Sequence, residues 1–284
     1  MAFTYTIVTI NILKLNLMQI ILIITSILLG MITTCKSLTT TQPSTATDRR
    51  KLSAFLFDID GTLVNSDPIH FVVFQELLVR EQQEGELSKN DDEQINEEFF
   101  RNKIAGRSNA LIMADLFPHW SMTRRESWSI NKEKQFRNKA SKLMMDLKMP
   151  GLDKLRTWIE NNKEVRRAAV TNAPRLNAEA MLSGIGYDDG FFESVVIGDE
   201  CERPKPDPCP YLTACDDLNV KAEECVVFED SPSGASAGVA AGAFVIGIKS
   251  GQEESTLVKA GCGLVIDNFE DPALWDCLEN KFRV

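Results

Sequence analysis

Two carboxylates, one residue apart, stand directly after a short apolar run. The run Phe55–Phe57 is followed by Asp58, Ile59, Asp60 and Gly61. A short apolar run that ends in a turn signal predicts a strand buried in a parallel sheet. Asp58 would then lie at the carboxyl end of that strand, where open α/β sheets bind their ligands. Because alternate residues of an extended chain face the same side, Asp60 can point into the same crevice.

A hydroxyl and an amide follow a second apolar run. Thr171 and Asn172 come after residues 167–170 and before Ala173-Pro174. Together with free backbone N–H groups at a helix start, they suit a dianionic phosphate. The same residues also fit an ordinary helix cap.

A lysine stands between two prolines, Pro204 and Pro206. Prolines stiffen a loop and hold Lys205 in a narrow range of directions. An inward lysine would supply a fixed positive charge, and a solvated lysine is the alternative.

Two further acids, Glu229 and Asp230, follow the apolar run Cys225–Phe228. Placed near Asp58 and Asp60, they would repel one another unless a cation lay between them. Hard oxygen ligands without a nearby histidine or cysteine favour Mg²⁺. The sequence therefore predicts a Mg²⁺ site at this edge of the sheet.

Short apolar runs alternate with helical segments from residue 150 onward. Strands are expected at 167–171, 194–198, 225–230 and 244–247, and helices at 152–160, 175–185, 210–218 and 233–241. This alternation predicts an α/β fold, with a Rossmann-like, doubly wound parallel sheet. Residues 67–149 instead show helical patterns without a convincing strand. We interpret them as an all-helical domain inserted into a core formed by residues 51–66 and 150–284.

The composition excludes some classes of partner. The chain has 284 residues, which fits about two domains, and a net charge of −10. Because the chain has no overall excess of positive charge, nucleic acid is not an expected partner. Seven cysteines, with no CxxC pair, favour a reduced compartment over a disulfide framework.

Residues 1–50 read as a hydrophobic leader followed by a Ser/Thr-rich linker. The apolar segment within residues 15–32 fits a signal peptide or a short membrane anchor. Translation from Met31 would instead leave a leader like a plastid transit peptide. These alternatives stay open, with the catalytic part expected in the cytoplasm or a plastid.

In this order, the motifs resemble the haloacid-dehalogenase-like superfamily of phosphohydrolases. They are Asp58–Leu63, Thr171–Ala173, Lys205-Pro206, and Glu229-Asp230 before a Gly/Ala-rich helix. The likeness runs from Leu52 to nearly the end of the chain. The helical insertion is similar to the first cap type of that superfamily, and we call residues 67–149 the cap.

Two cap segments are similar to the β-phosphoglucomutase-like branch: Asp67–His70 and Ile104–Asn109. Within that branch the chain resembles plant sugar-phosphatase or glycerol-phosphate-phosphatase enzymes. The resemblance implies that cap closure excludes water and brings residues to the leaving group. Arg107, Asn109 and His70 are the expected cap contacts.

The resemblance and the residue chemistry imply the same roles. Asp58 would form an aspartyl-phosphate, and Asp60 would act as general acid and then as base. Lys205 would offset charge, while Thr171 and Asn172 hold the phosphoryl oxygens.

The expected cofactor is Mg²⁺. Its ligands would be the Asp58 and Asp230 side chains and the Asp60 carbonyl. Glu229 would be a further ligand or a partner of the ligands.

Three functions remain in competition. The leading hypothesis is a Mg²⁺-dependent phosphatase of small phosphosugars or polyol phosphates, acting as a monomer on a small phosphorylated metabolite. The alternative is a phosphosugar mutase, although the cap shows no clear lysine of the kind that mutases use. The third is an inactive scaffold tethered to a membrane.

Overall fold

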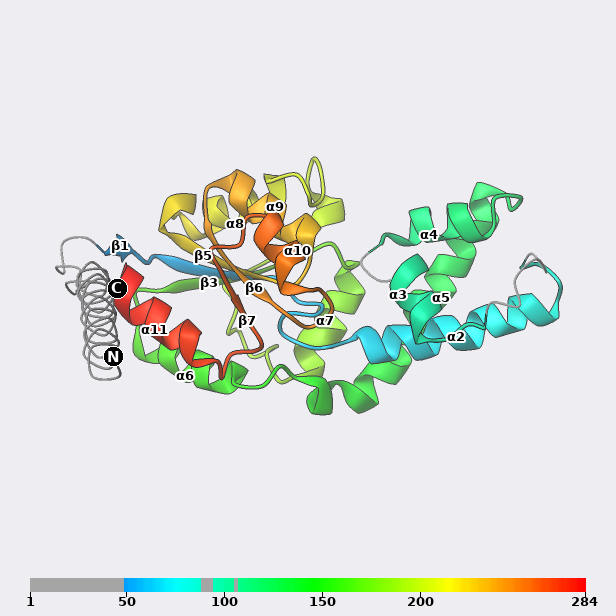
Figure 1. The fold of residues 1–284 in the computed structure, drawn as a ribbon, viewed down its shortest axis with the longest axis horizontal. Coiled ribbons are helices and arrows are strands. Elements are labelled where there is room, and N and C mark those ends of the chain that lie inside the picture. The colour runs from blue at the N-terminus through cyan, green and yellow to red at the C-terminus, as the bar shows by residue number, and fades with distance from the viewer. Residues whose placement is uncertain (1–48, 88–93, 105–106) are drawn as a thin grey trace, which may run out of the picture. The chain divides into compact units, whose positions relative to one another are not determined.

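A computed structural model of the chain describes residues 49–87, 94–104 and 107–284 (Figure 1). The predicted leader and linker lie outside this part of the chain, apart from their last two residues. In the described ranges, no helix has both the length and the apolar character that crossing a bilayer requires.

Six parallel strands form the central sheet, in the order β4-β3-β2-β5-β6-β7. They span Ala54–Phe57 (β2), Arg166–Thr171 (β3), Ser194–Ile197 (β4), Cys225–Glu229 (β5), Phe244–Ile248 (β6) and Leu264–Ile266 (β7). The chain builds outward from β2 through β3 and β4, then continues on the other side of β2 with β5. The winding direction therefore reverses between β2 and β5, and such a switch point opens a crevice at the carboxyl ends of the strands.

Alternate side chains of β2 enter two hydrophobic layers. Phe55 and Phe57 pack into one layer, and Ala54 and Leu56 into the other, because successive side chains of a strand point to opposite faces. Helices contribute to the first layer at Leu152–Asn161 (α6), Arg175–Gly184 (α7) and Pro272–Lys281 (α11), and to the second at Cys209–Leu218 (α8), Pro232–Ala241 (α9) and Glu254–Lys259 (α10). The predicted doubly wound, Rossmann-like α/β fold is confirmed.

The elements after residue 248 were not predicted. They are α10, β7, α11 and Phe282–Arg283 (β8), and β8 pairs with a further unpredicted strand near the start of the described chain, Arg50–Lys51 (β1). Strands of two or three residues are too short to show a periodicity, so the sequence gives little sign of them.

Helices make up all regular elements in the described part of the cap. They span Asp67–Gln83 (α2), Glu97–Lys103 (α3), Asn109–Leu116 (α4), Met122–Leu143 (α5) and Met144–Leu147 (η1, a 3₁₀ helix). Aromatic side chains fill their common core, as where Phe74 lies 5.8 Å from Trp128 between ring centroids. The limits of the cap as a separate domain stay a prediction.

Candidate active site

Three carboxylates meet at the carboxyl ends of β2 and β5. Oxygen atoms of Asp58, Glu229 and Asp230 lie within 4.8 Å of one another. The parallel register places Phe57 beside Phe228, and the backbone N–H of Asp58 donates to the Phe228 carbonyl at 3.0 Å. The sheet itself therefore brings together acids that are far apart in the sequence.

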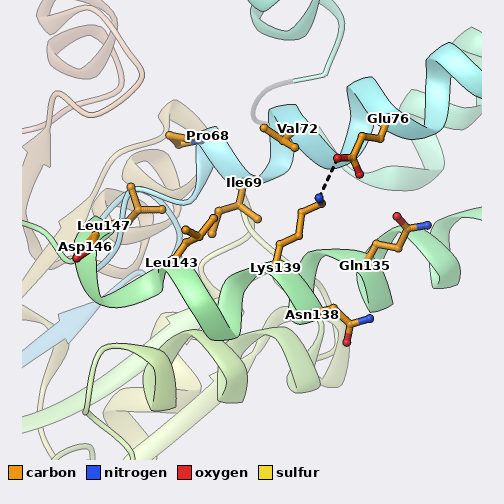
Figure 2. A pocket seen from close by; sticks show the side chains of 10 residues that line it. All are labelled: Pro68, Ile69, Val72, Glu76, Gln135, Asn138, Lys139, Leu143, Asp146 and Leu147. Carbon is orange, nitrogen blue, oxygen red and sulfur yellow. Dashed lines mark hydrogen bonds and ion pairs between the residues drawn. The ribbon is translucent and has the colours of Figure 1, made fainter.

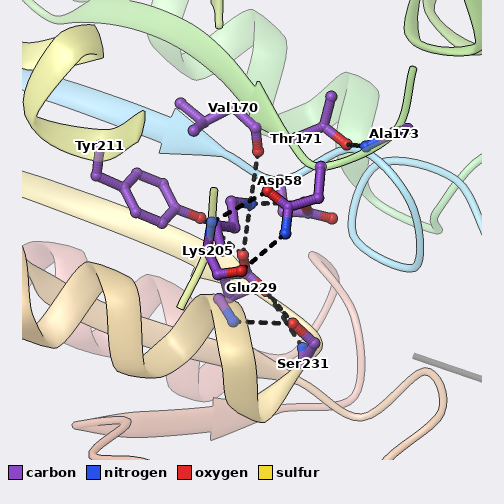
Figure 3. Close-up of polar contacts among 10 residues, drawn as sticks. Asp58, Val170, Thr171, Ala173, Lys205, Tyr211, Glu229 and Ser231 are labelled. Atoms are coloured by element: carbon purple, nitrogen blue, oxygen red, sulfur yellow. Dashed lines mark hydrogen bonds and ion pairs between the residues drawn. The ribbon is translucent and has the colours of Figure 1, made fainter. Parts of the chain in front are cut away.

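Lys205 connects these strands through its ammonium group. Its Nζ donates to Asp58 Oδ1, to Glu229 Oε1 and to the Val170 carbonyl, each at 2.7 Å (Figure 3). Burial alone would lower the pKa of Lys205, but the two carboxylates outweigh it and raise that pKa above its usual value. Of the two alternatives for Lys205, the structure shows the inward, buried ammonium.

Glu229 is saturated with donors. It is fully buried and accepts from Lys205, from the Tyr211 hydroxyl at 2.8 Å, and from the Ser231 backbone N–H and hydroxyl at 3.2 and 3.0 Å. A carboxylate has about four lone-pair sites, and these four bonds use them. Glu229 is thus better placed to hold Lys205 than to bind a metal directly, which favours the second of its two predicted roles.

Asp230 packs against a glycine that no other residue could replace. Gly61 has a φ of +80°, and a Cβ added there would overlap the Asp230 carboxylate. Burial, followed by the charges of Asp58 and Glu229, raises the pKa of Asp230 well above its usual value. A divalent cation would relieve this repulsion, so the residues present fit a Mg²⁺ ion.

Asp60 pairs with the first helix of the cap. His70 Nε2 lies 3.0 Å from Asp60 Oδ2. The His70 ring stacks on Phe136, with 4.1 Å between centroids. His70, one of the expected cap contacts, therefore lies beside the carboxylate predicted to act as acid and base.

The loop after β3 has one surprise. Thr171 is buried, and its hydroxyl accepts from the Ala173 backbone N–H at 3.0 Å. Both polar atoms of the Asn172 side chain bind the backbone of Lys205, at 3.1 and 3.2 Å. Asn172 therefore fixes the lysine loop, and its role in holding phosphoryl oxygens stays a prediction.

The predicted cap contacts differ in where the structure places them. His70 contacts Asp60, whereas Arg107 and Asn109 pair with other cap residues. The Arg107 guanidinium binds the Lys103 carbonyl at 2.8 Å and the Asp115 carboxylate, with no contact to the core residues above. Asp115, near the end of α4, is the acidic partner of Arg107, so among the described residues Arg107 is not brought to the site. Asn109 instead donates to the Glu133 carboxylate.

A buried group that sequence reasoning missed surrounds Glu133. We call it the cap cluster: Asn109, Lys132, Glu133 and Asn177. The signal was available, because Lys132, Phe136 and Ala140 recur every four residues and so share the buried face of α5. An apolar helix face that includes a lysine indicates a buried ammonium.

A hollow in the described part of the chain lies elsewhere, between α2 and α5. It has a volume of about 650 Å³ (Figure 2). Its lining includes Val72, Leu143 and the ion pair of Glu76 with Lys139, and none of the predicted site residues. The candidate active site is therefore defined by its side chains at the sheet edge.

Comparisons with known proteins agree with this geometry. A family model for haloacid dehalogenase-like hydrolases matches residues 52–242. The chain is 28% identical over 238 residues to the protein SUPPRESSOR OF QUENCHING 1, chloroplastic, of Arabidopsis thaliana, which covers 81% of this chain but only 21% of that longer protein. It is 28% identical over 191 residues to the phosphorylated carbohydrates phosphatase of Thermotoga maritima, covering 67% and 82% of the two chains.

A solved structure shows the same fold. The β-phosphoglucomutase of Clostridium difficile superposes with a TM-score of 0.66 and 20% identity, covering 81% of this chain and 97% of the other. The predicted resemblance is thus confirmed: the chain belongs to the haloacid dehalogenase-like hydrolases.

Proposed function

We propose that the chain is a Mg²⁺-dependent phosphatase that hydrolyses small phosphosugars or polyol phosphates through an aspartyl-phosphate. The observation that carries this proposal is the Lys205 ammonium against Asp58, with Asp230 beside it. A carboxylate held by a fixed charge suits attack on phosphorus, whose transition state depends on preorganised positive charge. The likeness to a phosphatase of phosphorylated carbohydrates supports the substrate class.

In the first step, a carboxylate oxygen of Asp58 bonds to phosphorus and the bond from phosphorus to the leaving oxygen breaks. Lys205 fixes the orientation of Asp58 through a 2.7 Å bond to Oδ1. The Thr171 hydroxyl accepts from the Ala173 N–H and keeps its own O–H, which is the expected donor to a phosphoryl oxygen.

Asp60 moves the proton in both steps. It gives a proton to the leaving alkoxide, then takes one from the water that hydrolyses the aspartyl-phosphate, which restores Asp58 and releases phosphate. The 3.0 Å contact with His70 orients the Asp60 carboxyl group.

Mg²⁺ would be held by Asp58, Asp230 and the Asp60 carbonyl, and when bound it would offset negative charge on the phosphoryl group. The crowding of the carboxylate oxygens within 4.8 Å supports this ligand set.

The test is phosphate release from a panel of phosphorylated sugars and polyols. We expect turnover with Mg²⁺, its loss after chelation, and its return when Mg²⁺ is added back. Absence of Mg²⁺-dependent turnover on every member of the panel would overturn the proposal and favour the inactive scaffold.

One observation favours the mutase as a second candidate. Lys132 is a buried cap cation with only 4% exposure, and its Nζ lies 5.8 Å from the Phe136 ring on which His70 stacks. The sequence had shown no clear lysine of this kind. Incubation with a hexose 1-phosphate distinguishes the two: free phosphate indicates the phosphatase, and hexose 6-phosphate the mutase.

A further inference from the structure

The cap cluster is a buried polar group that the proposed chemical steps do not use. Lys132, Glu133 and Asn177 are 4%, 8% and 2% exposed. Glu133 Oε1 accepts from the Lys132 ammonium at 2.9 Å and from Asn109, while Oε2 accepts from Asn177. Buried polar groups are retained when they are fully paired, and this carboxylate has three donors.

The cluster is connected to the active site through the Phe136 ring. Lys132 lies against the Phe136 ring, and the other partner of that ring, His70, contacts Asp60. Asn177 is in the first turns of α7, the helix that follows the Thr171 loop. Lys132 is thus linked to Asp60 through Phe136 and His70, and Asn177 belongs to the helix that follows the Thr171 loop.

The two buried charges of the cluster cancel. Burial alone would raise the pKa of Glu133, but Lys132 and the Asn109 hydrogen bond outweigh it and lower that pKa. Glu133 is therefore an anion at neutral pH and neutralises Lys132. Arg137, which is half-buried, donates to the Asn177 oxygen at 2.7 Å.

We propose that Glu133 is a specificity-determining residue, which admits leaving groups that carry hydroxyls and excludes those that carry a carboxylate or a second phosphate. This inference rests on the proposed phosphatase function. A hydroxyl of the leaving group can donate to the remaining lone pair of Glu133, or it can replace the hydrogen bond that Asn109 donates to Glu133. An anion would meet a like charge in a poorly hydrated place, because the Lys132 ammonium is already bound.

The experiment compares substrates that differ by one oxidised carbon. Glycerol 3-phosphate and 3-phosphoglycerate form one pair, and sorbitol 6-phosphate and 6-phosphogluconate form another. The measured quantity is kcat/KM for the anionic member divided by kcat/KM for the polyol, with Mg²⁺ and the full chain. The wild type should prefer the polyol in whichever pair it turns over.

Variants of the cluster should move this ratio in opposite directions. Glu133→Gln leaves Lys132 uncompensated and should raise the ratio about tenfold or more, the size expected for one partly buried charge. Lys132→Met leaves Glu133 uncompensated and should lower it. Asn109→Asp, at the first turn of α4 where an acid is tolerated, should also lower it and guards against misfolding of the buried variants.

A matched control pair lies on α2 and α5. Glu76 and Lys139 form an exposed ion pair at 2.9 Å, and Glu76→Gln and Lys139→Met repeat the same charge changes. Both should leave the ratio within about twofold of the wild type, as expected for surface charges.

The possible failures are distinct. If Glu133→Gln and Lys132→Met move the ratio in the same direction, or leave it unchanged while both remain folded by circular dichroism, the cluster is only structural and the inference is overturned. A wild type that turns over the anionic substrate as fast as the polyol overturns this inference but leaves the phosphatase in place. A wild type without any Mg²⁺-dependent turnover overturns the proposed function first.

Discussion

Two buried lysines in this protein have opposite surroundings. Lys205 in the core faces two carboxylates, and Asp230 adds a third negative group within reach of a shared ligand. Lys132 in the cap faces one carboxylate, which amides also hold. The core site thus has an excess of negative charge that a bound cation can neutralise. In the cap, the charges of Lys132 and Glu133 already cancel. The same residue types can therefore support chemistry in one place and selection in the other, according to how their charges sum.

The largest effect should follow from removing the nucleophile. Asp58→Asn keeps the size of the side chain but loses the attacking carboxylate, so we expect kcat for phosphate release to fall by at least about 10³-fold. Asp189→Asn, an exposed aspartate that binds Arg156, is the control and should retain wild-type turnover. Full activity in Asp58→Asn would assign the nucleophile to another residue.

The next effect is a difference in folding stability between variants of the two buried lysines, Lys205 and Lys132. Lys205→Met leaves two buried carboxylates without a counter-charge in the metal-free protein, and we expect the free energy of unfolding to fall by about 3–5 kcal/mol. Lys132→Met should cost less, because it leaves only one carboxylate, Glu133, without a counter-charge. Urea denaturation measures both, and an equal or reversed order would break the proposed contrast in charge balance.

A smaller effect is the pH dependence of folding stability, which should have opposite signs for Asp58 in the core and Glu133 in the cap. Burial raises the pKa of Asp58 from 3.8 to about 8, so the folded, metal-free protein binds more protons than the unfolded chain, and its stability falls as the pH rises through this window. The lowered pKa of Glu133 does the reverse, since its contribution is present above about pH 4.5 and is lost as the pH falls below that value.

Urea midpoints across pH 3 to 9 test these signs. Asp58→Asn should flatten the change between about pH 4 and 8, and Glu133→Gln should flatten the acid side. If both variants followed the wild-type profile, other groups would govern the pH dependence.

The smallest effect concerns the leader. Removal of residues 1–47 should leave kcat within about twofold of the full chain, because every residue assigned to the chemistry lies beyond Asp48. Phosphate release by the two proteins provides the comparison, and a large loss in a folded truncate would mean that the leader contributes to the site.

The core of the site was largely predictable from sequence. Asp58 and Asp230 follow apolar runs, and parallel strands bring their carboxyl ends to one edge, so their meeting follows from the fold class. The proline-flanked loop around Lys205 left an inward and a solvated lysine open, and the structure shows the inward one. These predictions needed only local patterns and the rules of α/β sheets.

The cap could not be predicted in the same way. Asn109, Glu133 and Asn177 meet across 24 and 44 residues of sequence, and which turn of one helix faces another depends on side-chain packing that no short motif records. Arg107 shows the same limit, since a nearby aspartate captured a cation that the motif had suggested for the substrate.

Asn172 has a consequence for how the active site can be altered. Its side-chain amide hydrogen-bonds both the N–H and the carbonyl of Lys205. The segment after β3 and the proline-flanked segment are therefore held together as one unit. A substitution that reshapes either segment must therefore be matched by a change in the other. The Lys205 ammonium keeps its orientation only where both hydrogen bonds of the Asn172 amide are kept.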